Sequence, residues 1–414
     1  MADTLRVLVK ACGTHRDIAL IQEGKLTEYY TEDAAEGTLV NAVLLGRVEN
    51  VVPGIKAAFV QIGQPLNGFL PLNEMPSFRQ AEGDRAPASG AEMIVQVKKD
   101  PKDQKGAFLT RDIALPGQNL IYMPLNHYVG VSKRVTEPQE RETLLAMGRE
   151  LGAETEFGLI MRYAALYARK EELLAELTAL RTRWTEIQSK ATYQKAPATL
   201  YRDPSALTSL VRDYAPRYQL TITCNDAVNR MPAPSTGLLW EQVSETEMEA
   251  AWRAARIPEQ LAEALSRKVT LKNGGSLVID EREALSTVDV NSGRYIGDQD
   301  GELALKLNLA ACEEIAHQIR LRNLCGILLI DFIDMKTDAA RDAVKEKLKA
   351  SLSRERDKTV LHGFTSLGLL EMTRKRTGVS LRDALTTPCG ACGGTGYRIQ
   401  PERETTPCET NPNL

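Results

Sequence analysis

A strand–helix–strand pattern in residues 285–331 constrains the fold of this chain more than any other segment. Leu285 to Val290 is short, apolar and β-branched, and residues 302–322 repeat apolar side chains every three to four positions, at 303, 307, 311, 315 and 319. Gly326 to Ile330 is almost wholly apolar, as expected of a strand covered on both faces. Two strands joined by a helical crossover run parallel when they share a sheet, so both are expected to end at the same edge.

Polar side chains follow both predicted strands. Asp289 and Asp331 lie at the two strand ends, and Asn291 faces the same side as Asp289 on an extended chain. Mg²⁺ binds oxygen ligands and takes one or two carboxylates together with water and substrate phosphates. The pattern therefore predicts a magnesium site at Asp289 and Asp331, with Asp334 as a weaker candidate. The alternative is that these aspartates only cap or turn the strands.

The composition is that of a globular protein with more than one domain. A chain of 414 residues is too long for one compact core, and 43% of its residues are hydrophobic and 26% charged. No apolar run reaches the roughly 18 residues that span a bilayer, and the start lacks a secretory signal. The seven cysteines are scattered, which favours a reducing cytoplasm.

Charge gives a weaker indication of partners. The net charge of −3 argues neither for nor against nucleic acid. Residues 341–358 hold seven basic and four acidic side chains, and Arg374, Lys375 and Arg376 follow downstream. This pattern is typical of a helix that meets backbone phosphates, and equally of a solvated helix with i,i+4 ion pairs.

The remaining segments alternate between β-rich and helical patterns. Residues 5–30 read as hairpin strands, and residues 38–112, with short strands and Gly or Pro turns, as a small all-β barrel containing a loop at 79–91. Residues 113–207 predict one strand at 158–163 and helices at 136–150 and 164–190. Residues 268–290 predict a meander around the turn Asn273-Gly274-Gly275.

Cys389 and Cys392 form a Cys-x-x-Cys turn followed by glycines, which suits two thiolates on one Zn²⁺. Zinc needs four ligands, and the other cysteines are poorly placed to supply them. A second copy of the chain would complete the site, so the pair predicts a homodimer with one shared zinc. A redox dithiol is the alternative.

The string GRVENVVPGIKAAFVQIG in the predicted barrel resembles an OB-fold RNA-binding barrel of the S1 type. Four further motifs occur in one order and at close spacing: VDVNSGR, LLIDFIDM, GLLEMTRKR (368–376) and CGACGGTG (389–396). Together they resemble the ribonuclease E/G family over nearly the whole chain. The resemblance implies a mixed α+β, multidomain fold. Its parts are an RNase H-like subdomain without the RNase H active site (1–37 and 208–267), an OB-fold RNA-binding barrel (38–112), a 5′-end sensor-like subdomain (113–207), a DNase I-like α/β catalytic subdomain (268–385), a zinc-link (386–397) and a disordered tail (398–414).

The same resemblance implies roles for individual residues. Asp289 and Asp331 would hold Mg²⁺ with help from Asn291, and Cys389 and Cys392 would hold the dimer's Zn²⁺. RNA contacts are implied for Phe59, Phe69, Lys105, Lys133 and Lys358. Without the resemblance, phenylalanines in strands are more often core residues. Ile121, Arg162 and Tyr163 match a 5′-monophosphate pocket, although the family has threonine where this chain has Tyr163.

The expected function is a Mg²⁺-dependent endoribonuclease that cleaves single-stranded RNA, not DNA, and leaves 5′-phosphate and 3′-hydroxyl ends. RNA processing and decay, including rRNA maturation, in the cytoplasm would follow from the resemblance. Larger family members continue into a domain that pairs dimers, which this chain does not show, so we expect a dimer. Two rivals stay open: an RNA-binding ribosome-maturation factor without catalysis, and a phosphohydrolase acting on a small nucleotide.

Overall fold

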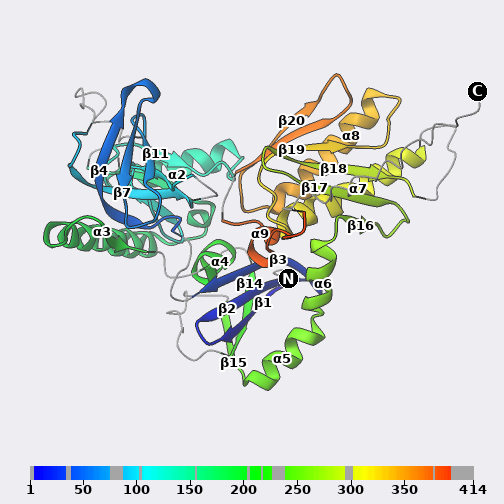
Figure 1. Cartoon of the computed structure of the whole chain (residues 1–414), viewed down its shortest axis with the longest axis horizontal. Helices are drawn as coiled ribbons and strands as arrows, with labels where there is room; N and C mark the ends of the chain where they lie inside the picture. Colours follow the sequence, from blue (N-terminus) through cyan, green and yellow to red (C-terminus); the bar gives the residue numbers. More distant parts are fainter. Residues whose placement is uncertain are drawn as a thin grey trace, which may run out of the picture.

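The computed structural model describes residues 4–33, 39–74, 87–101, 105–153, 156–202, 206–215, 218–225, 238–293, 302–375 and 378–392. Figure 1 shows three bodies: a β-barrel with the long helix α3, a helix-covered sheet that carries the predicted metal site, and a smaller sheet between them that contains the N-terminal strands. The predicted loop at 79–91 lies largely outside the described residues, as do the glycines of the zinc-link and the tail 398–414.

The smaller sheet joins two distant segments of the chain. Its strand order is β15-β14-β1-β2-β3, and β1 runs parallel to β14 while it forms a hairpin with β2. The two segments that the resemblance assigned to one RNase H-like subdomain therefore share one sheet. The elements are β1 (Thr4–Cys12), β2 (His15–Gln22), β3 (Lys25–Asp33), α4 (Ala206–Tyr214), β14 (Gln219–Cys224), β15 (Leu238–Gln242), α5 (Glu245–Ala254) and α6 (Ile257–Leu265).

The barrel closes through five strands. β4 pairs with β5 and, on its other side, with β7, and the order continues β5-β6-β8-β7. Its core is apolar, with Val60, Leu70 and Leu109 fully buried. The elements are β4 (Val43–Val52), β5 (Ala57–Gln61), β6 (Gly68–Pro71), β7 (Glu92–Lys99) and β8 (Phe108–Thr110), with β13 (Ala198–Tyr201) added to β4 from a later part of the chain.

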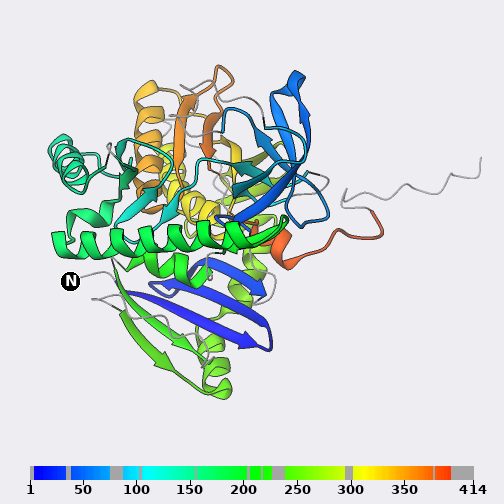
Figure 2. The same ribbon diagram turned by 90° about the vertical axis from the view of Figure 1, so that its left-hand side faces the viewer.

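Residues 113–202 contain more strand than the sequence pattern predicts. The strand predicted at 158–163 is present as β12, but the expectation of a single strand is wrong, because a four-stranded sheet of order β11-β12-β10-β9 forms here. Helix α3 also begins later than predicted, since Tyr163–Leu166 forms a 3₁₀ turn and Arg169 begins α3 in a capping box with Glu172. Figure 2 shows the length of α3. The elements are β9 (Leu115–Pro116), β10 (Leu120–Met123), β11 (Val129–Val131), α2 (Pro138–Glu150), β12 (Gly158–Met161) and α3 (Lys170–Tyr193).

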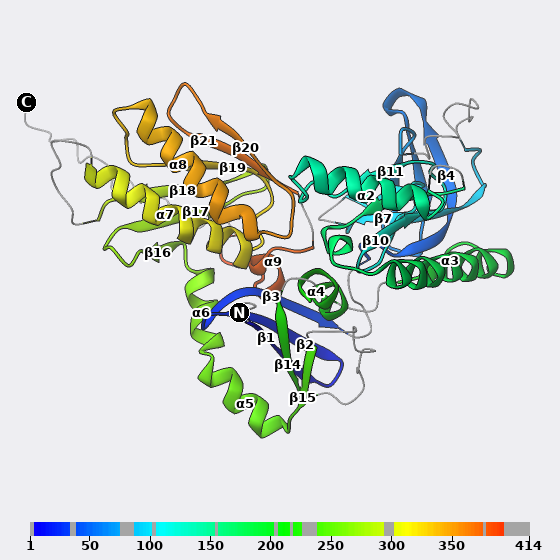
Figure 3. The ribbon, with the colours of Figure 1, turned by 180° about the vertical axis from the view of Figure 1, so that it is seen from behind.

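The largest sheet is mixed and has the order β16-β17-β18-β19-β21-β20. The predicted meander and the parallel crossover pair β18–β19 are confirmed. Helices α7 and α8 cover the same face, as Figure 3 shows from behind. The elements are β16 (Lys268–Thr270), β17 (Ser276–Glu281), β18 (Leu285–Asn291), α7 (Glu302–Leu321), β19 (Gly326–Asp331), α8 (Asp338–Ser351), β20 (Thr359–Phe364), β21 (Leu370–Arg374) and α9 (Leu381–Leu385).

The opposite face of this sheet is open, so the expectation that β19 is covered on both faces is wrong. Leu328 and Ile330 are fully buried against α7 and α8, but Ile327 is 50% exposed and Leu329 is half-buried. Val360 of β20 is also exposed on the sheet. An apolar strand therefore leaves one face uncovered, and that face carries the predicted metal site.

A buried charge network joins the smaller sheet to the largest one. Glu28 of β3 accepts hydrogen bonds from Tyr214 of α4, from Tyr30 at 2.6 Å and from Arg320 of α7 at 2.7 Å. Although burial raises the pKa of Glu28, Arg320 and Arg356 outweigh it and lower the pKa from 4.5 to about 2. The network therefore fixes how the two sheets lie against each other. No described helix has an apolar stretch long enough to cross a membrane.

Candidate active site and RNA-binding surfaces

The two predicted metal ligands lie side by side. Asp289 of β18 pairs with Asp331 of β19 in the parallel register, and both side chains are exposed on the open face. Partial burial raises the pKa of the Asp331 carboxyl, and the negative charges of Asp289 and Asp334 raise it further. The carboxylates therefore lie on neighbouring strands, and within the described residues neither forms an ion pair with a lysine or arginine, an arrangement that suits a divalent cation.

Asn291 is held against this carboxylate pair. Its Nδ2 donates a hydrogen bond of 2.9 Å to Oδ2 of Asp289. The chain then turns at Gly293, which has φ +67°, and a Cβ atom there would collide with the carbonyl oxygen of Gly274. Glycine is therefore required for the chain to leave the site in this direction.

Asn308 positions the other strand end and was not identified from the sequence. It is fully buried on α7, its Nδ2 donates to the carbonyl oxygen of Ile333 at 2.8 Å, and its Oδ1 accepts from the amide of Ile333 at 3.1 Å. This pair of bonds fixes the loop between Asp331 and Asp334. The sequence offered one indication of this role: Asn308 is a polar residue next to Leu307, on the apolar side of a predicted helix.

Within the part of the chain that the structure describes, no group of three or more His, Cys, Asp or Glu side chains forms a metal site. The carboxylate pair alone offers fewer ligands than Mg²⁺ requires. Since Mg²⁺ usually keeps several waters and binds substrate phosphates, a site with two protein carboxylates fits this ion and leaves positions for RNA.

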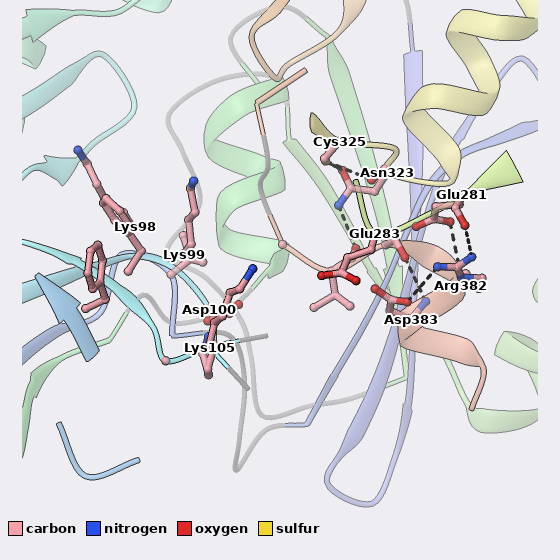
Figure 4. A pocket seen from close by; sticks show the side chains of 18 of the residues that line it. Lys98, Lys99, Asp100, Lys105, Glu281, Glu283, Asn323, Cys325, Arg382 and Asp383 are labelled. Atoms are coloured by element: carbon pink, nitrogen blue, oxygen red, sulfur yellow. Dashed lines mark hydrogen bonds and ion pairs between the residues drawn. The ribbon is translucent and has the colours of Figure 1, made fainter. Parts of the chain in front are cut away.

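The predicted RNA contacts of the barrel lie on a cleft of about 1030 Å³. Phe59, Phe69 and Lys105 line one wall, and residues of the largest sheet and of α9 line the other. Figure 4 shows Lys98, Lys99 and Lys105 on one side, and Glu281, Glu283 and Asp383 on the other. On the second wall Arg382 forms ion pairs with Glu281 and Asp383, so the lysines of the barrel wall are the groups that would attract a polyanion in this cleft.

Lys133 and Lys358 lie close together, and Lys375 joins them to form what we call the lysine cluster. The proximity of Lys133 lowers the pKa of Lys358, and the charge of Lys375 lowers it further. The backbone amide of Lys375 also donates to the carbonyl oxygen of Lys358 at 2.8 Å. Three like charges repel one another unless an anion lies between them, so the cluster suits a phosphate backbone.

The lysine cluster and the cleft lie at the opposite end of β19 from Asp331. Arg374, which precedes Lys375, pairs with Gly326 at the start of β19, and Cys325 lines the cleft. Asp331 is five residues further along, about 17 Å at ~3.3 Å per residue. In one copy of the chain, the carboxylate pair and the basic surfaces therefore lie about the length of β19 apart.

The three residues matched to a 5′-end pocket lie near one another in sequence and sheet, but the arginine already has partners. Ile121 of β10 pairs with Ile160 of β12, just before Arg162 and Tyr163. Nη1 of Arg162 donates to the carbonyl oxygen of Gly117 at 2.6 Å, and Nη2 to Asp213 at 2.5 Å. A terminal phosphate would therefore compete with the Asp213 carboxylate.

Asp213 was also missed at the sequence level, because it lies 51 residues from Arg162 along the chain. Burial raises the pKa of its carboxyl, but Arg162, Arg356 and Arg212 outweigh this and hold the pKa below its usual value. Tyr163 stacks edge-to-face on Tyr167, with hydroxyl oxygens 2.8 Å apart. The local chemistry is thus an ion pair beside an aromatic pair.

Cys389 and Cys392 come close enough for a shared turn. The amide of Cys392 donates to the carbonyl oxygen of Cys389 at 3.3 Å, and Cys389 is exposed. This turn suits two thiolates on one metal ion. The glycines that follow lie beyond the described residues.

Comparison with known proteins now adds to this geometry. The S1 RNA binding domain model matches residues 40–112, and the Ribonuclease E/G family model matches residues 114–377. Ribonuclease G of Haemophilus influenzae is 34% identical over 95% of this chain and 84% of its own length. Ribonuclease G of Escherichia coli K12 gives the same three figures, and Ribonuclease E of a Nostoc species is 31% identical over 94% of this chain and 60% of its own length.

A chain that joins an S1 RNA binding domain to this catalytic region is an RNA-binding endoribonuclease. It belongs to the ribonuclease E/G family.

Proposed function

We propose that the chain is a Mg²⁺-dependent endoribonuclease that cleaves single-stranded RNA, with Asp289 and Asp331 as the ligands of the catalytic ion. The observation that carries this proposal is the register of β18 and β19, which puts the two carboxylates opposite each other beside Asn291. When bound there, Mg²⁺ supplies charge stabilisation at the phosphate and a nucleophile from water at neutral pH. Hydrolysis of this kind leaves a 5′-phosphate and a 3′-hydroxyl.

The protein groups around the ion have separate tasks in this proposal. Asp289 and Asp331 bind the ion, while the hydrogen bond from Asn291 holds the Asp289 carboxylate in one orientation. Asn308 keeps the loop after Asp331 in place. The open face of the sheet gives RNA direct access to the carboxylate pair.

RNA binding is assigned to surfaces away from the carboxylate pair. Phe59 and Phe69 offer rings on which unpaired bases stack whatever their sequence, and Lys105 offers charge to the backbone. Lys133 and Lys358 act within the lysine cluster. Ile121, Arg162 and Tyr163 are the candidate 5′-end pocket, with Asp213 as the competitor of the phosphate.

The cysteine pair is proposed to bind half of a structural Zn²⁺ site, with Cys389 and Cys392 of a second copy supplying the other half. Such a homodimer would present two carboxylate pairs and two barrels to one RNA. Processing and decay of RNA in the cytoplasm, including rRNA maturation, is the proposed setting.

The test is cleavage of a labelled single-stranded RNA in Mg²⁺ by wild type, Asp289→Asn, Asp334→Asn and Asp342→Asn. Asp289→Asn removes one of two carboxylates and is expected to lower the cleavage rate more than about 100-fold, since the ion contributes several kcal/mol. Asp334→Asn tests whether the weaker candidate ligand contributes, and Asp342→Asn, which changes an exposed aspartate of α8, is the control that should retain full activity. RNA binding without any cleavage by wild type would instead favour the ribosome-maturation factor.

A second substrate separates the two enzyme candidates. A small-nucleotide phosphohydrolase would cleave a mononucleotide diester as well as an oligonucleotide. The proposed endoribonuclease should cleave only the oligonucleotide, because its barrel and lysine cluster bind several nucleotides at once.

A further inference from the structure

Three aromatic rings and one lysine form a row across four neighbouring strands of the barrel. Phe59 of β5 pairs with Phe69 of β6, and Phe69 pairs with Phe108 of β8. The ring centroids are 5.9 Å apart in both pairs. Lys99 of β7 pairs with Phe108, and its Nζ lies 5.3 Å from the centroid of that ring.

This row lies on the outer surface of the barrel and is not part of its core. Each ring alternates along its strand with a fully buried neighbour: Val60, Leu70 and Leu109. These neighbours belong to the barrel's hydrophobic cluster, whereas Phe59, Phe69 and Phe108 do not. All three rings line the cleft instead, together with Lys99.

The chemistry of such a row is specific to a polymer. A base can stack on an aromatic ring, and the phosphate next to it can bind a nearby cation. A single-stranded RNA that crosses the barrel surface would therefore contact a ring and a lysine in turn. The Lys99 side chain is exposed and long, so its ammonium group reaches a phosphate while the Phe108 ring receives a base. A core packing role would require neither exposure nor an adjacent lysine.

We propose that Phe108 and Lys99 form a further nucleotide-binding position, which continues the surface of Phe59 and Phe69 by one base and one phosphate. The ligand is single-stranded RNA of any sequence, since every base has a stacking face. This inference rests on the proposed RNA-binding role of the barrel and extends it to two residues with no assigned role.

The first test measures RNA binding without cleavage. Fluorescence anisotropy of a labelled single-stranded oligonucleotide, in a buffer without Mg²⁺ and without a chelator that would remove Zn²⁺, compares wild-type chain with Phe108→Leu, Phe69→Leu and Tyr193→Leu. Stacking contributes about 1–3 kcal/mol per base, so Phe108→Leu is expected to weaken binding roughly 5- to 150-fold. Tyr193 is 85% exposed at the end of α3 and does not line the cleft that contains the row, so its replacement should change nothing.

The controls separate failure of this inference from failure of the proposed function. If Phe69→Leu weakens binding while Phe108→Leu matches Tyr193→Leu, the extra position is wrong and the RNA-binding barrel stands. If neither phenylalanine variant weakens binding, both the extra position and the barrel's proposed role are wrong. Omitting Mg²⁺ keeps either result independent of Asp289 and Asp331.

The second test gives a signal that a purely structural role would not produce. Phe108→Trp keeps an aromatic ring at this position. Addition of RNA should quench the tryptophan fluorescence of this variant more than that of wild type, because a base stacks on the new ring. Lys99→Gln, added to Phe108→Trp, should lower the slope of log affinity against log salt by about 1 and leave the quenching of Trp fluorescence in place. Absence of quenching at saturating RNA would overturn the proposal.

Discussion

Replacing Glu28 by glutamine should destabilise the protein in a way that depends on pH. Glu28 is 4% exposed and is the carboxylate that Arg320 and Arg356 share. Its pKa falls from 4.5 to about 2 in the folded chain, and each pKa unit corresponds to about 1.4 kcal/mol. The ionised carboxylate therefore contributes about 3 kcal/mol at neutral pH, an order-of-magnitude value.

The direction with pH follows from the lowered pKa. Because the folded chain binds the Glu28 proton less readily than the unfolded chain, the stabilisation is complete above about pH 4.5 and disappears as the pH falls towards 2. Glu28→Gln has no such proton to bind. Wild type and variant should therefore differ most at neutral pH and converge in acid.

Thermal unfolding followed by circular dichroism between pH 7 and pH 3 measures this difference. For a cooperative unit of 150–250 residues, about 3 kcal/mol lowers the Tm by roughly 6–12 °C at pH 7. Glu186→Gln, which changes an exposed glutamate in the middle of α3, is the control and should leave the Tm unchanged. A variant as stable as wild type at pH 7, or a Tm difference that stays constant down to pH 3, would refute the reasoning.

Three further predictions concern ligands. Lys358→Gln should lower the slope of log RNA affinity against log salt by about 1, because one phosphate contact of the lysine cluster is lost. Lys170→Gln is the control, since the Lys170 side chain is paired with Glu150, and it should leave the slope unchanged. Equal slopes for the two variants would contradict the role of Lys358. RNA with a 5′-monophosphate should be cleaved less than about tenfold faster than RNA with a 5′-hydroxyl, since Asp213 already pairs with Arg162; a larger ratio in parallel time courses would disprove it. Zinc chelation should convert a dimer to a monomer in sedimentation experiments, and Cys389→Ser should be monomeric at any zinc concentration; a dimer that survives both changes would exclude the zinc-link.

Prediction from the sequence succeeded where a regular spacing of apolar residues determines the local structure. Leu307, Ala311, Ile315 and Ile319 repeat at helical spacing and are all buried on α7. The crossover then forces β18 and β19 to run parallel, and this alone brings Asp289 and Asp331 together. No contact between distant residues had to be guessed.

Prediction from the sequence failed where the structure depends on very short strands or on contacts between distant segments. Strands β9 and β11 have two and three residues, too few to show an alternating pattern. Ile327 looks buried by composition, but its exposure depends on which face the helices cover. Asp213 is paired with Arg162, 51 residues away along the chain, and Phe108 can be recognised as part of a surface row only once its contact with Phe69 is seen in space.

The strand order of the smaller sheet has a consequence during protein synthesis. β1 leaves the ribosome together with its hairpin partner β2, but β14, its parallel partner on the other edge, follows roughly 200 residues later. At about 5–20 residues per second, the β1 edge waits on the order of 10–40 s for its partner. Leu5, Val7 and Val9, fully buried in the finished fold, lie along that edge. The nascent chain is therefore most prone to pairing with a wrong strand in this interval, and completion of β14 ends it.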